Sequence, residues 1–102
     1  MPTLERRLVV TEDAGLHARP AAAFAQAAAR AAAEVTVARA DAGAAARPVP
    51  ARSVLSLLGL NIRRGDEIVL RASGADAERT LDALAAIAAP PDRRFPPVTP
   101  LP

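Results

Sequence analysis

The sequence predicts an α+β domain whose elements follow the order β-α-β-β-α-β-α. Its 102 residues fit a single domain, and its 51% apolar and 24% charged residues are the balance of a folded protein. Short segments in which apolar and polar residues alternate indicate strands. Runs of helix-forming residues indicate helices, and glycine, asparagine, aspartate and serine mark the turns between elements.

A strand and a long helix are expected first. Residues 4–10 end in two valines and are interpreted as a strand, whereas residues 11–15 are small or polar, as in a loop. Residues 18–33 are almost all helix formers, with a proline near the start, where proline is tolerated. The residues expected to form the buried stripe of this helix are Pro20, Phe24, Ala27 or Ala28, and Ala31.

A hairpin is predicted next. Residues 34–40 alternate as in a strand, with two valines on one face and Thr36 and Ala38 on the other. Residues 41–43 carry a turn signal, and residues 44–50 are expected to return as the partner strand. The two prolines of this partner lack an N–H, so it is expected to be an edge strand or an irregular strand.

The second half of the chain is expected to hold a short helix, a strand and a last helix. Ser53 is the predicted N-cap of a helix over 54–60, and Asn61 follows it in a left-handed or turn position. Residues 63–65 form a predicted turn before a strand over 66–72, in which Ile68 and Leu70 point inward and Val69 outward.

Asp76 is expected to cap the last helix, and the residues expected in its buried stripe are Ala77, Leu81, Leu84 and Ala88. Beyond this helix, residues 90–102 contain six prolines. Such a segment is typical of a disordered or polyproline-like tail. The sequence therefore predicts a folded domain over residues 1–89 and a proline-rich tail over residues 90–102.

Composition excludes several classes of function. Without cysteine the chain has no disulfide, thiol catalysis or cysteine-bound metal, and its single histidine argues against a histidine metal site. All thirteen basic residues are arginine, and eleven acids leave a net charge of only +2. The arginines are scattered without accompanying aromatic residues, which argues against nucleic-acid binding. No apolar run could span a bilayer and no secretion signal is evident, so we expect a soluble, cytoplasmic protein without membrane contact.

The only histidine of the chain opens the long predicted helix. Gly15 allows a sharp turn before His17, and Arg19 follows two residues later. The first N–H groups of a helix are unpaired and carry about half a positive charge, so they form a ready anion site. An imidazole aimed at such a site is a nucleophile placed to accept a phosphoryl group and pass it on. An ordinary polar cap would leave the arginine and the glycine unexplained.

The segment around this histidine resembles a known signature. Gly15-Leu16-His17-Ala18-Arg19-Pro20-Ala21 is similar to the active-site motif of the HPr family, the histidine phosphocarriers of the bacterial phosphoenolpyruvate–sugar phosphotransferase system. Three further segments resemble that family in order and spacing: Arg52-Ser53-Val54-Leu55, Gly65-Asp66-Glu67-Ile68 and Ala72-Ser73-Gly74-Ala75-Asp76. The resemblance extends over residues 4–89.

This resemblance implies an HPr-like βαββαβα open-faced sandwich, in which three helices cover one face of a four-stranded antiparallel sheet and the third strand lies at an edge. It implies that His17 accepts phosphate on Nδ1 from enzyme I and donates it to IIA-type domains of sugar permeases. Arg19 would steady the phosphoryl oxygens, with the backbone N–H groups of Ala18 and Arg19 around them. The expected protein is a monomeric carrier without metal or cofactor, rather than an enzyme that turns over free substrate.

Two further roles follow from the same resemblance. Pro20, Val54, Leu55 and Leu58 are expected to dock partner proteins, and Ser53 matches the site at which a dedicated kinase phosphorylates many family members. Ser53 could equally be only an N-cap. The alternative function is a regulatory module of the same family, acting through phosphorylated His17 or Ser53 on regulators rather than in sugar uptake.

Overall fold

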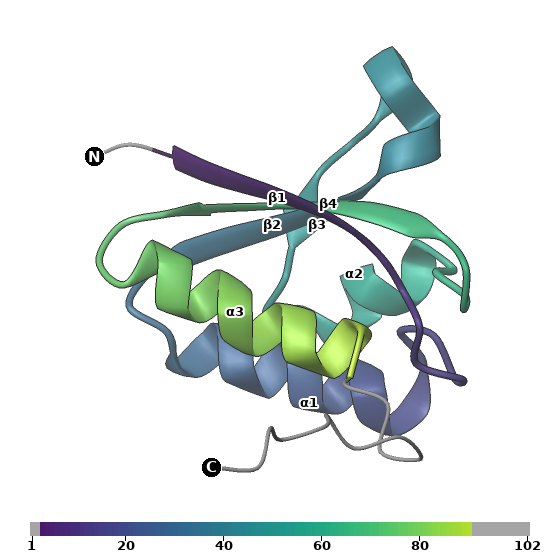
Figure 1. Cartoon of the computed structure of the whole chain (residues 1–102), viewed down its shortest axis with the longest axis horizontal. Coiled ribbons are helices and arrows are strands. Elements are labelled where there is room, and N and C mark those ends of the chain that lie inside the picture. The colour runs from purple at the N-terminus through teal and green to yellow at the C-terminus, as the bar shows by residue number, and fades with distance from the viewer. Residues whose placement is uncertain (1–2, 91–102) are drawn as a thin grey trace, which may run out of the picture.

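A computed structural model describes residues 3–90, which form a four-stranded antiparallel sheet with three α-helices on one face (Figure 1). The predicted element order is confirmed. The elements are β1 (Thr3–Val9), α1 (Ala18–Arg30), β2 (Glu34–Arg39), the 3-10 helix η1 (Ala40–Ala45), β3 (Val49–Pro50), α2 (Val54–Gly59), β4 (Glu67–Ser73) and α3 (Ala77–Ala88). Residues 91–102, most of the predicted tail, lie outside the described residues.

The strands lie in the order β1-β4-β2-β3, so β4 occupies the interior of the sheet between β1 and β2. The prediction that the third strand lies at an edge is confirmed. It pairs with β2 only at Val49 and Pro50, and the missing N–H of a proline is tolerated at an edge. None of the helices between Thr3 and Pro90 combines the length and apolar character needed to cross a bilayer.

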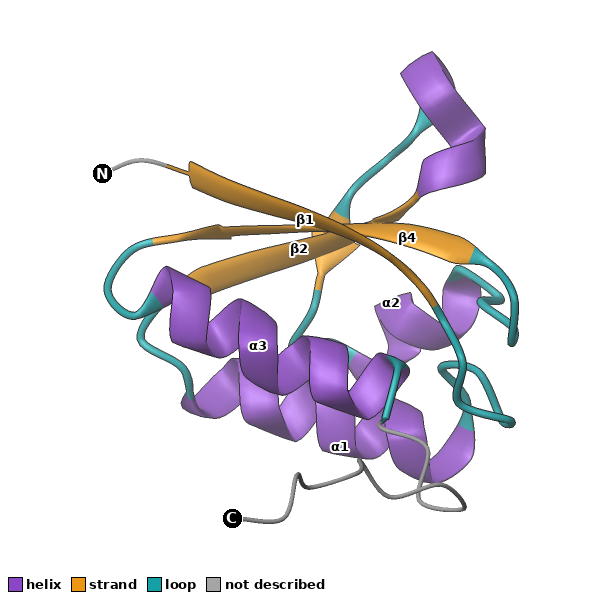
Figure 2. Ribbon diagram, in the orientation of Figure 1, coloured by secondary structure: helices purple, strands orange, loops and turns teal. Residues whose placement is uncertain are grey.

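The core lies between the sheet and the three α-helices (Figure 2). The inward residues of β4, Ile68 and Leu70, are fully buried as predicted, and so is the expected stripe of α3. The stripe predicted for α1 is partly wrong: Pro20 and Ala31 are only half-buried. The side chains of α1 that are buried are Ala21, Phe24, Ala25 and Ala28.

Helix α1 also ends at Arg30, three residues before the predicted end. Ala31 adopts an extended backbone with φ −75° and ψ 148°. Ala33 then enters the core on the way into β2, where it is 4% exposed. Burial of Ala33 in the core overrides the helix propensity of the alanines in this connection.

The hairpin prediction is wrong for residues 41–48. In place of a tight turn and a return strand, the chain forms η1, interrupted at Gly43, whose φ is 54° and ψ −126°. This segment projects on the face of the sheet opposite α1, α2 and α3 (Figure 1). Val69 was expected to point outward and lies on that face, opposite Ala38 of β2, yet both are buried, because η1 and the chain after it fold back over them.

Asp76 is the N-cap residue of α3, but its expected capping hydrogen bond is absent. Its φ of 58° is in the left-handed region, and its side chain makes no cap contact. Its carbonyl oxygen instead accepts hydrogen bonds from the N–H and the Oγ1 hydroxyl of Thr80, both at 2.9 Å. The carboxylate of Asp76 therefore does not cap the first turn of the helix.

Candidate functional site

His17 is the N-cap residue of α1. Its backbone is extended, with φ −125° and ψ 165°, and its carbonyl accepts a hydrogen bond from the Ala21 N–H at 3.4 Å. Its side chain makes no capping hydrogen bond, and the residue is half-buried. His17 is therefore partly accessible to a partner. Among residues 3–90, no three His, Cys, Asp or Glu side chains gather as metal ligands would.

The first turn of α1 favours an anion. Ala18 and Arg19 are exposed, and their backbone N–H groups stand at helix positions that have no intrahelical acceptor. The first turn contains no acidic residue that would compete for these groups. Ala18 has a φ of 50°, which is strained for a residue with a side chain and costs about 1–2 kcal/mol. This strained residue directly follows the extended His17.

The loop before His17 is attached to the loop that follows α2. The Leu16 N–H donates to the Ile62 carbonyl at 3.1 Å, and both side chains are fully buried. Gly15 packs so closely that a Cβ there would lie 2.3 Å from the Ile62 oxygen, and its φ is 61°. Sequence reasoning identified the turn at Gly15 but not its contact, which joins residues 47 positions apart in the chain.

Arg39, at the end of β2, holds this second loop in place. Its Nη1 donates to the carbonyls of Leu60 and Asn61, each at 3.2 Å, and lies 3.1 Å from Asp66 Oδ2. Its Nε and Nη2 donate to the Asp41 carboxylate at 3.0 Å. Asp41 and then Asp66 raise the pKa of Arg39. No local pattern in the sequence pointed to this role of Arg39.

Asp66 is bound from two sides. Its Oδ2 accepts a hydrogen bond from the Arg63 N–H at 2.8 Å, in addition to the contact with Arg39. The Arg63 N–H, followed by Arg39, lowers the pKa of the Asp66 carboxyl. Hydrogen bonding by Arg39 lowers the pKa of Asp41 in the same way. The loop over residues 60–66, on which Gly15 and Leu16 rest, is thus tied to β2 by charged groups.

Helix α2 packs against α1 and presents apolar side chains outward. Ser53 is its N-cap, as predicted, and its Oγ accepts a hydrogen bond from the Ser56 N–H at 3.2 Å. Leu57 is buried in the core, whereas Val54, Leu55 and Leu58 are exposed, Leu55 by 83%. The N-terminus of α1 and helix α2 lie at the same end of the molecule (Figure 1). Pro20, the fourth predicted docking residue, is half-buried.

Comparisons with known proteins agree with this geometry. The family model described as "PTS HPr component phosphorylation site" matches residues 4–89. A phosphocarrier protein HPr of Streptomyces coelicolor is 45% identical over 85 residues, covering 83% of this chain and 87% of its own. One from Haloferax volcanii is 40% identical, covering 89% and 99%. The crystal structure of an HPr from Bacillus anthracis superposes with a TM-score of 0.76 at 35% identity, covering 84% and 96%.

Proposed function

The chain belongs to the HPr family of phosphocarrier proteins of the phosphotransferase system, and from this premise we propose that His17 is its phosphoryl acceptor. The donor would be phosphorylated enzyme I and the acceptors IIA-type domains of sugar permeases. The observation that carries the proposal is the partly exposed His17 at the N-cap of α1, beside N–H groups that have no intrahelical acceptor.

The transfer exchanges one phosphorus–nitrogen bond for another. The Nδ1 lone pair of His17 attacks the phosphorus of a phosphohistidine on the donor, and the donor's P–N bond breaks as the new one forms. The leaving imidazole keeps the electron pair of that bond. In the second step, a histidine of the acceptor attacks the phosphorus held on His17, and the imidazole of His17 is the leaving group. The protein returns to its starting state after each cycle and needs no metal ligand of its own.

The N-terminus of α1 would stabilise the transferred group. A phosphoryl group on His17 would carry negative charge next to the Ala18 and Arg19 N–H groups, an interaction worth about 0.3–1 kcal/mol at an exposed helix end. The Arg19 guanidinium, exposed at the same turn, would add charge-assisted hydrogen bonds to the phosphoryl oxygens.

The exposed apolar side chains of α2 support a docking role. Val54, Leu55 and Leu58 remain in contact with water although Leu57 of the same helix is buried. A partner that covered these three side chains would bring its own histidine to the end of the molecule where α1 begins. Pro20, in the first turn of α1, would lie at the border of that contact.

Ser53 is the proposed regulatory site, and it is the basis of the second candidate function. Its hydroxyl is at the N-cap of α2 and the residue is half-exposed, directly before Val54 and Leu55. A phosphate there would add about two negative charges beside the apolar docking side chains. Docking onto enzyme I would weaken, and the phosphorylated protein would be free to act on regulators.

The test is phosphoryl transfer from ³²P-phosphoenolpyruvate through purified enzyme I. We expect acid-labile, base-stable label on the wild type and none on His17→Ala, whereas Arg19→Ala should be labelled more slowly. Arg30→Gln, at the far end of α1, is the matched control and should be labelled normally. Label that persists on His17→Ala would contradict the proposal.

A further inference from the structure

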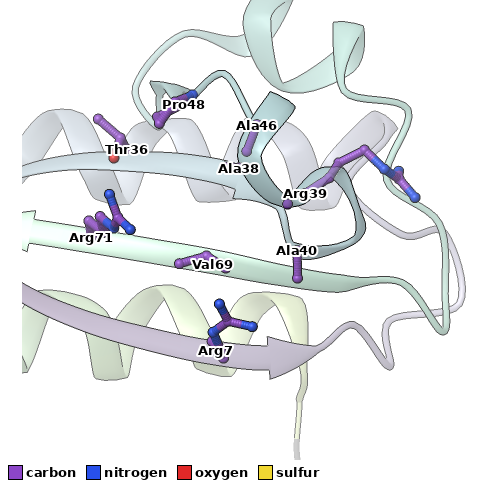
Figure 3. Close-up of a pocket in the computed structure, with 10 residues that line it drawn as sticks. Arg7, Thr36, Ala38, Arg39, Ala40, Ala46, Pro48, Val69 and Arg71 are labelled. Carbon is purple, nitrogen blue, oxygen red and sulfur yellow. The ribbon is translucent and has the colours of Figure 1, made fainter.

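A pocket of about 300 Å³ lies on the outer face of the sheet, the face that α1, α2 and α3 leave open (Figure 3). Strands β2 and β4 form its floor, and η1 with the residues that follow it forms one wall. Its lining residues are Arg7, Thr36, Ala38, Arg39, Ala40, Gly43, Ala46, Pro48, Val69 and Arg71. None of them is acidic. None of the residues proposed above for phosphoryl transfer or partner docking lines this pocket.

Small apolar side chains form part of the floor and the wall of the pocket, beside the polar Thr36 and Arg71. Ala38 and Val69 are opposite each other in the β2–β4 pairing, and they are only 7% and 8% exposed. Ala46 and Pro48 face the same space from the segment after η1. The space suits a short apolar group.

Two arginines that border the pocket, Arg7 and Arg71, have side-chain N–H groups that donate no hydrogen bond within the described part of the chain. Arg7 on β1 lies opposite Val69, and Arg71 on β4 lies opposite Glu5, so the two are diagonal neighbours, about 7–8 Å apart at their bases. The closest carboxylate oxygens to Arg7 are 3.8 and 3.9 Å away, too far for hydrogen bonds. Arg71 uses only its Nε, which donates to Glu5 at 2.9 Å.

Arg39 has a different role, because its guanidinium points away from the pocket toward the loop over 60–66 (Figure 3). The terminal nitrogens of Arg7 and Arg71 are therefore the cationic donors available to a ligand. Glu5 is their competitor, since it binds Arg71 and lies closest to Arg7. A dianion would compete with the single charge of the Glu5 carboxylate more strongly than a monoanion would.

We propose that this pocket binds a phosphate monoester with a short apolar organic group. The dianionic phosphate would lie between Arg7 and Arg71 and take charge-assisted hydrogen bonds from both. The organic group would lie on Ala38 and Val69, against Pro48. A volume of about 300 Å³ is at the lower end for small-molecule sites, which limits the ligand to a small one.

Titration with phenyl phosphate, followed by amide chemical shifts, tests the site. We expect saturable shifts at Thr36, Ala38 and Val69. Arg71→Gln and Arg7→Gln should each weaken binding by about tenfold or more, because each removes a charge-assisted hydrogen bond. Glu5→Gln should tighten binding, because it removes the competitor. Arg30→Gln, an exposed arginine on α1, should bind as the wild type does.

Three outcomes would overturn the proposal. They are shifts confined to Ala18 and Arg19, affinity unchanged in both pocket arginine variants, and inorganic phosphate binding as tightly as phenyl phosphate. Shifts confined to Ala18 and Arg19 would place the anion at the helix end beside His17. Thermal unfolding of each variant checks its fold, and Arg7→Gln, which breaks no hydrogen bond, keeps the test valid if Arg71→Gln is unstable.

Discussion

Position 15 has two requirements that only glycine satisfies. Its φ of 61° disfavours any side chain, and a Cβ would lie 2.3 Å from the Ile62 oxygen and 2.8 Å from the Arg63 Cα, both backbone atoms. Gly15→Ala should therefore push the two loops apart. We expect a loss of stability of about 2–4 kcal/mol, measured by urea unfolding, together with slower labelling of His17.

Gly65→Ala separates the two requirements. Gly65 also has a positive φ, 94°, but a Cβ there would meet nothing within 4 Å. It should show the conformational cost alone, about 1 kcal/mol. Equal losses for Gly15→Ala and Gly65→Ala would mean that the contact with Ile62 contributes nothing.

Ser53 combines a structural and a proposed regulatory role, and substitution can separate the two. Ser53→Ala removes the N-cap of α2 and should cost about 1 kcal/mol in thermal or urea unfolding. Ser53→Asp keeps a good N-cap, so it should fold as stably as the wild type while its charge slows phosphoryl transfer from enzyme I. Normal transfer by Ser53→Asp would argue against regulation at this position. Ser56→Ala, whose backbone alone takes part in the cap, is the control.

At the scale of elements, Arg39 joins β2 to the loop after α2, and that loop supports the segment leading to His17. Arg39→Gln should free the carbonyls of Leu60 and Asn61 and leave Asp66 without its cation. We expect the Leu16 and Arg63 amides to exchange with solvent about tenfold faster, because both bond to this loop. Arg47→Gln, an exposed arginine beyond η1, should leave both rates unchanged.

The same loop should make the protein sensitive to acid. The pKa of Asp66 is lowered by the Arg63 N–H and by Arg39. A carboxyl whose pKa is lower in the folded state contributes stability above its unfolded pKa and loses that contribution as the pH falls through the folded value. As the pH is lowered below about 4, the melting temperature should therefore fall. The fall should be less steep in Asp66→Asn than in the wild type. A drop in Asp66→Asn as steep as that of the wild type would count against this account.

At the scale of the whole molecule, the helix end that carries His17 and the exposed face of α2 lie together, on the side of the sheet away from η1 (Figure 1). Leu55 is 83% exposed and contributes little to the core. Leu55→Asp should therefore unfold at the same denaturant concentration as the wild type. Phosphoryl transfer should nevertheless slow by about tenfold or more, because weaker docking raises the KM of enzyme I for this protein. Unchanged transfer kinetics would place docking elsewhere.

Much of the fold was predictable because it depends on local patterns. The inward residues of β4, the stripe of α3, the cap at Ser53 and the left-handed Asn61 all follow from period, propensity and backbone preference. The stripe of α1 was harder to place, since a helix rich in alanine offers several equivalent faces.

The sequence by itself determined where α1 begins, and with it the place of the only histidine at a helix end, because glycine, proline and helix propensity act on neighbouring residues. Only the tertiary structure decided three other features: the contact of Gly15 with Ile62, the role of Arg39, and the pocket between η1 and the sheet. Each of these depends on residues far apart in the chain. Such contacts form only when the strands pair, and they leave no periodic trace in the sequence.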